Sequence, residues 1–220
     1  MPDSLSSKTL LVEAAKELVR EHGIEKTTVL QITQRAGLNR QTFYKHFSDK
    51  YNLVNWACYT EFITVQDEAL SKSGWAAVES ILSFFEHDRV FFGSGLKDTG
   101  QNAFGAYIVE VFSRIIKNFT EEGFQLYGLS EKEINGICHE LADDFRTGIV
   151  FWLFEEPEKN AREFFDVLNN AARAFSAMIC AFNKAAHNTS ACEFPFELPM
   201  QRIDDEKRSA LIDDLHRIER

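Results

Sequence analysis

The segment that most constrains the fold of this chain begins at Thr28 and contains capping and stop residues at short intervals. Thr28 is suited to cap a helix, and a glutamine stands at the capping-box position three residues later. Gly37 can end that helix in a left-handed conformation, and Asn39 can cap the next one, which we expect over residues 40–46. Ser48 is then suited to cap a third helix. This order predicts a helix-turn-helix.

The second of these helices has one apolar and one polar face. Phe43 and Phe47 are four residues apart, so both point into the protein. The residues left outside can all form hydrogen bonds: Arg40, Gln41, Thr42, Tyr44, Lys45 and His46. Arginine pairs with guanine and glutamine with adenine in the major groove of DNA, while the other polar side chains suit contacts to phosphates. We therefore predict DNA binding through these six residues, through Thr28, and through Lys50 at the start of the third helix.

A helical hairpin with a merely solvated polar face would be the alternative, and a wider pattern argues against it. The segment contains Thr27-Thr28-Val29, Ile32, Ala36-Gly37-Leu38, Thr42-Phe43-Tyr44, His46-Phe47, Lys50 and Leu53. This pattern resembles the N-terminal signature of the TetR family of bacterial transcriptional repressors. The resemblance implies an all-α, homodimeric, cytoplasmic regulator that binds double-stranded operator DNA. It also implies a body that commonly encloses a cavity for a small-molecule effector.

The net charge of −10 is unevenly distributed along the chain. Residues 1–58 contain eight Lys/Arg and six Asp/Glu, which leaves a charge of +2 there and −12 on the remainder. An acidic body repels the DNA polyanion, so a mildly basic head favours oriented binding over indiscriminate coating of DNA.

The rest of the chain is expected to be helical, because no stretch alternates apolar and polar residues with a period of two. We expect an all-α fold, with a DNA-binding head over residues 1–52 and a regulatory and dimerisation body over 53–190. A tail over 191–220 contains a predicted amphipathic helix at 203–218. Gly93-Ser94-Gly95 lacks the preceding strand and third glycine of a phosphate-binding loop, so we expect a turn between helices there.

Aromatic residues are concentrated outside the head, because 18 of the 20 phenylalanines belong to the body and tail once Phe43 and Phe47 are set aside. These rings can form a filled core, or they can line an apolar effector cavity with a few polar groups. For the cavity we expect the residues Phe62, Phe85, Phe104, Tyr107, Ile108 and Phe145, with Arg114 and His139 as polar anchors.

A second form of control is suggested by residues 148–154 and the turn containing Pro157. This segment resembles the branch of the family that includes the dihydroxyacetone-kinase regulators, in which a protein co-regulator can be the signal. Dimerisation is expected through the small residues Ala171, Ala174, Ala181 and Ala185, which form a seam on the last long helix. With the helix over 130–156, this seam would build a two-fold four-helix interface.

Other chemistry has little support in the sequence. His139 and Asp143 are four residues apart, but a second histidine and a third ligand are missing, so we expect no metal site. We expect no cofactor and no enzymatic activity, because no nucleophile motif is recognisable. Four cysteines without metal-binding spacing suit reduced thiols in the cytoplasm. No apolar stretch is long enough to cross a membrane.

Overall fold

The computed structural model describes residues 4–70, 74–98, 103–126 and 128–187, and all regular secondary structure within these ranges is α-helical. The helices are α1 (Ser4–His22), α2 (Val29–Arg35), α3 (Arg40–Tyr44), α4 (Lys50–Leu70), α5 (Gly74–His87), α6 (Arg89–Lys97), α7 (Phe104–Leu126), α8 (Glu131–Glu155) and α9 (Ala161–His187). The all-α prediction is confirmed. The predicted tail helix lies outside the described residues.

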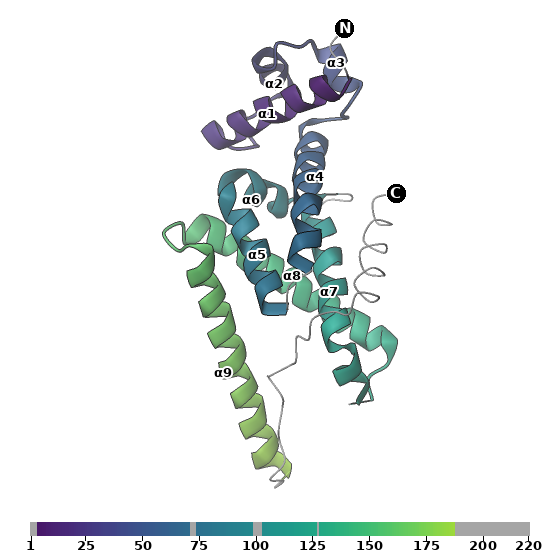
Figure 1. Cartoon of the computed structure of the whole chain (residues 1–220), viewed down its shortest axis with the longest axis vertical. Helices are drawn as coiled ribbons and strands as arrows, with labels where there is room; N and C mark the ends of the chain where they lie inside the picture. The colour runs from purple at the N-terminus through teal and green to yellow at the C-terminus, as the bar shows by residue number, and fades with distance from the viewer. Residues whose placement is uncertain (1–3, 71–73, 99–102, 127, 188–220) are drawn as a thin grey trace.

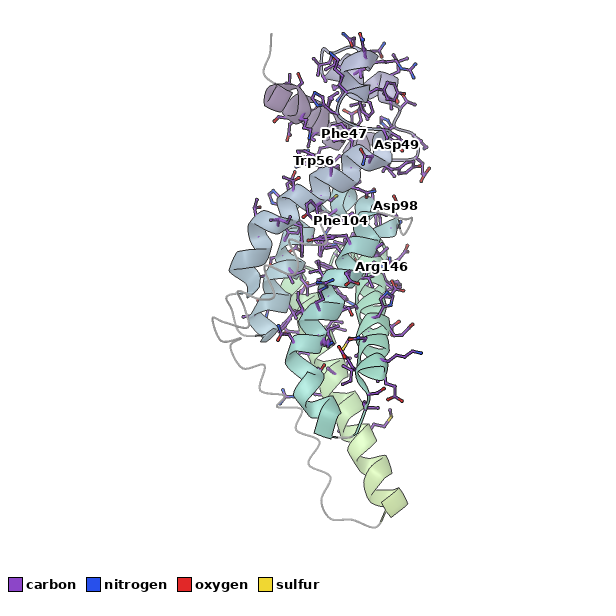
Figure 2. The ribbon with its side chains drawn as sticks, turned by 90° about the vertical axis from the view of Figure 1, so that its right-hand side faces the viewer. Phe47, Asp49, Trp56, Asp98, Phe104 and Arg146 are labelled. Carbon is purple, nitrogen blue, oxygen red and sulfur yellow. The ribbon has the colours of Figure 1, made fainter. Side chains whose placement is uncertain are left out.

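Helices α1–α3 form a compact head at one end of the molecule, and α4 runs from the head into the body (Figure 1). The head has its own apolar core, in which Leu11, Ile32 and Phe43 are completely buried. At the junction Phe47 of the head contacts Trp56 of α4, with ring centroids 5.7 Å apart (Figure 2). The head is therefore a folded unit attached to the body through one continuous helix.

The predicted caps of the head are mostly correct. Thr28 and its glutamine form the full capping box at the start of α2, and Gly37 adopts a left-handed φ of 67°. Asn39 caps α3 through its side chain. The prediction for Ser48 is wrong, because α4 is capped by Asp49, whose Oδ1 accepts from the backbone N–H of Asn52 at 2.8 Å. Either residue type caps a helix well, so the sequence pattern alone does not separate them.

The prediction of a turn at Gly93-Ser94-Gly95 is also wrong, because these residues lie inside α6 and are buried. A Cβ atom at Gly93 would lie 2.6 Å from the ring of Phe154 in α8. A Cβ atom at Gly95 would lie 2.8 Å from Cys58 Sγ in α4. The glycines thus let three helices approach closely, and this packing outweighs their weak helix propensity.

The body packs α5–α8 around a core rich in aromatic rings, and α9 extends beyond the other helices at the end away from the head (Figure 1). At the start of α9, Phe164 stacks on Trp152 of α8 with centroids 4.8 Å apart and planes 2° from parallel. Both side chains are buried. The first turns of α9 are therefore fixed to the body, although Val167 and Met178 farther along are exposed.

Candidate nucleic-acid interface

The recognition helix α3 is short, and its orientation is fixed by one buried ring and one cap. Phe43 is completely buried between the head helices and contacts Phe47 at 5.9 Å between ring centroids. Asn39 Oδ1 accepts from the backbone N–H of Thr42 at 2.8 Å and from the Thr42 hydroxyl at 3.1 Å. This pair fixes the N-terminal end of α3, which is the end that faces base edges in helix-turn-helix proteins.

The opposite face of α3 brings together most of the side chains predicted to bind DNA. Arg40, Gln41, Tyr44 and Lys45 are exposed, and Thr42 and His46 are half-buried. The Arg40 guanidinium donates to the Tyr44 hydroxyl at 3.3 Å and lies 5.9 Å from the centre of its ring. This contact restricts the long arginine side chain before any DNA is present, which lowers the entropy lost on binding.

Thr28 lies exposed at the start of α2, and its hydroxyl takes part in the capping box. The hydroxyl accepts from the Gln31 backbone N–H at 3.2 Å, and Gln31 Oε1 accepts from the Thr28 backbone N–H at 2.9 Å. A contact of this threonine with a phosphate would therefore be made by a side chain already fixed in place.

Lys50, which was also predicted to contact DNA, has its ammonium group bound inside the head. Its Nζ donates to the backbone carbonyls of Ile24, Glu25 and Thr27 at 2.8, 3.0 and 3.0 Å. An ammonium group has three protons, so these carbonyls use its full donor capacity. The sequence pattern identified a cation but could not show that a turn more than 20 residues earlier would bind it.

Several other cations of the head are paired with carboxylates of neighbouring helices. Arg35 of α2 pairs with Glu17 and Glu21 of α1, each at 2.9 Å, and these contacts raise the arginine's pKa. Lys16 pairs with Glu61 of α4. Arg40 and Lys45, by contrast, have no carboxylate partner among the described residues, so their charges remain available to a polyanion.

The head is joined to the body by an ion pair that the sequence patterns did not reveal. Arg20 of α1 donates to Asp88 Oδ2 from Nε at 2.9 Å and from Nη2 at 2.5 Å. The side chain of Asp88 is only 8% exposed, and its Oδ1 accepts from the Phe91 backbone N–H at the start of α6. One carboxylate therefore links the DNA-binding head to the first turn of α6.

A cleft of about 620 Å³ opens at the same junction. Its walls come from the turn between α1 and α2, from Tyr51 of α4, from α6 and from Phe154 of α8. Asp98, at the end of α6, lies on this side of the molecule below the head (Figure 2). The cleft does not contain any of the residues predicted to bind an effector.

Four of those predicted effector residues are buried in the core: Phe62, Phe85, Phe104 and Ile108. Phe62 stacks on Phe85 with centroids 5.9 Å apart, and Phe104 contacts both rings at 6.2 and 6.4 Å. These phenylalanines fill the space between α4, α5 and α7 by packing against one another.

The other predicted effector residues are separated from one another. Tyr107 is half-buried against Tyr59 of α4, with centroids 4.6 Å apart, and burial raises the pKa of Tyr107. The Tyr59 hydroxyl is buried and has no hydrogen-bond partner among the described residues. Phe145 packs on Phe112 at 5.0 Å.

The two predicted polar anchors also lie apart. Arg114 is paired with Glu110 at 2.9 Å. His139 is exposed on α8, beside a buried Cys138. Within the described part of the chain, no group of three or more possible metal ligands comes together. In the same residues, no helix is long and apolar enough to cross a membrane.

Residues 11–56 match the model of a family described as bacterial regulatory proteins, tetR family. The HTH-type dhaKLM operon transcriptional activator DhaS of Lactococcus lactis subsp. lactis (strain IL1403) is 24% identical over 93 residues, covering 42% of this chain and 50% of DhaS. The transposon Tn10 TetC protein of Escherichia coli is 33% identical over 82 residues, covering 35% of this chain and 40% of TetC. This chain thus spans half or less of either relative.

A solved structure of the dihydroxyacetone kinase operon activator DhaS has a TM-score of 0.51 to this chain at 17% identity. The alignment covers 75% of this chain and 93% of that chain. Similarity at this identity shows a shared fold. Together with the match over residues 11–56, it confirms the family resemblance of the head and the helical architecture of the body.

Two substitutions on α3 should have different effects on DNA affinity. Arg40→Ala is expected to cost about 1–3 kcal/mol on the preferred sequence and to relax selection at one base pair of each half-site. Lys45→Ala should weaken all sequences alike, because a phosphate contact carries no sequence information. Titration of each variant with preferred and scrambled duplexes measures both effects. An equal loss on both duplexes for Arg40→Ala would show that Arg40 does not read a base.

Proposed function

We propose that this chain, whose residues 11–56 form the N-terminal domain of the tetR family of bacterial regulatory proteins, is a homodimeric transcription regulator that reads operator DNA with α3. The main support for this proposal is the set of exposed hydrogen-bond donors on α3, a helix whose orientation is fixed by Phe43 and Asn39. Arg40 and Gln41 lie near the start of that helix, where base contacts are made. The family resemblance implies that this protein is soluble and binds DNA in the cytoplasm.

Dimerisation is supported by apolar side chains left exposed on α8 and α9. On α8 these are Ile137, Leu141 and Phe151, which are 36%, 45% and 55% exposed. On α9 they are Val167 and Met178, each 48% exposed, with Ala171 and Ala174 between them. Counted from Ile137, the other two side chains of α8 lie four and fourteen residues along the helix. Counted from Val167, the other three of α9 lie four, seven and eleven residues along. These spacings correspond to one face of each helix.

A second copy of the chain would cover both faces in a four-helix interface. The two heads would then be related by a two-fold axis, which requires a palindromic operator. Half-sites one helical turn apart, or a multiple of it, would be separated by about 34–36 Å or a multiple of that distance.

Two forms of control are supported by different observations. A small-molecule effector is supported by the buried Tyr59 hydroxyl, which has no partner in the described part of the chain and can therefore donate a hydrogen bond to a bound ligand. This hydroxyl belongs to α4, which runs directly into the head. An effector beside Tyr59 and Tyr107 would move α4 and change the distance between the two recognition helices.

Control by a protein co-regulator is supported by the packing of the phenylalanine core. Phe62, Phe85 and Phe104 contact one another, so a ligand among them would have to separate buried rings. The similar protein DhaS is named as an activator of the dhaKLM operon, whereas the family resemblance of the sequence suggested repression. Both outcomes use the same DNA-reading geometry, because the position of the operator relative to the promoter determines the sign.

Ala174→Glu is expected to convert the dimer into monomers. The substitution would place two unpaired carboxylates against each other in the seam, and unpaired buried charge is strongly destabilising. Sedimentation measures the mass, and selection from a random duplex pool should give a palindrome for the wild type and single half-sites for the variant. Ala106→Glu, at an exposed alanine of α7, is the matched control and should remain dimeric. A dimeric Ala174→Glu variant would place the interface elsewhere.

Thermal unfolding with a panel of small polar metabolites should distinguish the two forms of control. An effector at a hundred times its Kd raises the free energy of unfolding by about 2.7 kcal/mol. By reciprocity, operator DNA must weaken the binding of an inducer by the same factor by which the inducer weakens DNA binding. Tyr59→Phe removes the unpaired hydroxyl and should abolish the stabilisation. A stabilising metabolite that binds Tyr59→Phe equally well would exclude this site, and no stabilisation at all would favour the protein co-regulator.

A further inference from the structure

The turn between α1 and α2, residues 23–28, is bound by the first turn of α4 at several points. Lys50 Nζ donates to three backbone carbonyls of this turn, those of Ile24, Glu25 and Thr27, at 2.8–3.0 Å. The neighbouring Tyr51 hydroxyl donates to Glu25 Oε2 at 3.2 Å. Both contacts join residues that are more than 20 positions apart in the chain.

The turn has little regular hydrogen bonding of its own. It begins at Gly23, whose φ of 83° ends α1, and the carbonyls of Glu25 and Thr27 lie between α1 and α2, while that of Ile24 also accepts from the Thr27 backbone N–H at 3.2 Å. Thr27 is buried, and its hydroxyl donates to the Gly23 carbonyl at 2.9 Å. A lysine ammonium carries three donors and no acceptor, so it can satisfy several carbonyls of one turn at once.

We propose that Lys50 is a positioning residue of the DNA-binding head. It holds the α1–α2 turn against α4, so that α2 and α3 move together with α4 as one body. Thr28, which caps α2, directly follows the bound carbonyl of Thr27. Without this contact α2 would keep its ion pairs with α1 but lose the link between its N-terminal end and α4. Helix α3, which packs on α2, would then lose its fixed position relative to α4. The inference rests on the proposed DNA-binding function and assigns Lys50 a role within it.

A positioning role for Lys50 predicts a different salt dependence of operator affinity from the one that a phosphate contact would give. Each phosphate contact contributes about 0.9 to the slope of log K against log salt concentration, hence about 1.8 for the two subunits of a dimer. Lys50→Met should lower operator affinity about tenfold, since hydrogen bonds from a charged group are lost, while leaving the salt slope unchanged. Lys45→Met is the matched control and should reduce the slope by about 1.8.

Two further measurements separate positioning from a general loss of stability. Amide hydrogen exchange should become faster at Thr27 in Lys50→Met, whereas exchange over residues 161–170 of α9 should not change. Lys50→Arg keeps the charge and would preserve a phosphate contact, but a planar guanidinium does not reproduce a compact ammonium bound to three carbonyls. Its operator affinity should therefore stay reduced, and this variant carries the test if Lys50→Met does not fold.

A salt slope reduced by about 1.8 in Lys50→Met, or full operator affinity in Lys50→Arg, would overturn the proposal and assign Lys50 to a phosphate. Unchanged exchange at Thr27 would also overturn it. The wild-type titration is interpreted first, because absence of DNA binding there would refute the proposed function. The exchange measurement needs no DNA, so it tests the contact between α4 and the turn separately.

Discussion

The arrangement of head and body depends on the buried carboxylate of Asp88. One of its oxygens accepts two hydrogen bonds from Arg20 of the head, and the other accepts the first backbone N–H bond of α6. A charge this buried requires a partner, because removing one member of a buried ion pair leaves an uncompensated charge. The position of α1 and the start of α6 are consequently determined by the same group.

The next residue extends this connection to the far side of the body. Arg89 donates to the carbonyl of Trp152 at 3.5 Å and to that of Lys159, and its guanidinium lies 4.6 Å from the centre of the Trp152 ring. These acceptors flank the turn between α8 and α9, the two helices proposed to form the dimer interface. Arg146 of α8 donates to the Leu96 carbonyl at the other end of α6, at 3.0 Å. Helix α6 is thus held to α8 and to the α8–α9 turn by arginines at both of its ends.

Most parts of the fold set by neighbouring residues could be predicted from the sequence, and those set by distant contacts could not. Thr28 and Asn39 cap helices through groups within three residues of themselves, and both predictions are correct. Ser48 is an exception, because the adjacent Asp49 is an equally good cap and takes its place. The helix through Gly93 and Gly95 was missed because its stability comes from Phe154 and Cys58, which are remote in sequence. Local propensity favours a turn there.

The candidate site divides in the same way. The outward face of α3 follows from the spacing of Phe43 and Phe47, so its donors could be identified in advance. The partners of Lys50 and of Arg20 lie 23–26 and 68 residues away, so their positioning roles required the structure. Most of the predicted effector residues are apolar, and an apolar pattern identifies buried rings without showing whether they enclose a space or fill it.

A double-mutant cycle of Arg20→Ala and Asp88→Asn, read out as affinity for the selected operator, tests most directly whether this ion pair orients the head. Asparagine caps a helix as well as aspartate does, so Asp88→Asn keeps the start of α6 while removing the charge. Each single variant should weaken operator binding about tenfold, because two heads with free orientations lose more entropy on entering successive grooves. The double variant should be no weaker than either single variant, which corresponds to a coupling of about 1.4 kcal/mol. Additive losses, or single variants with unchanged affinity, would contradict the account.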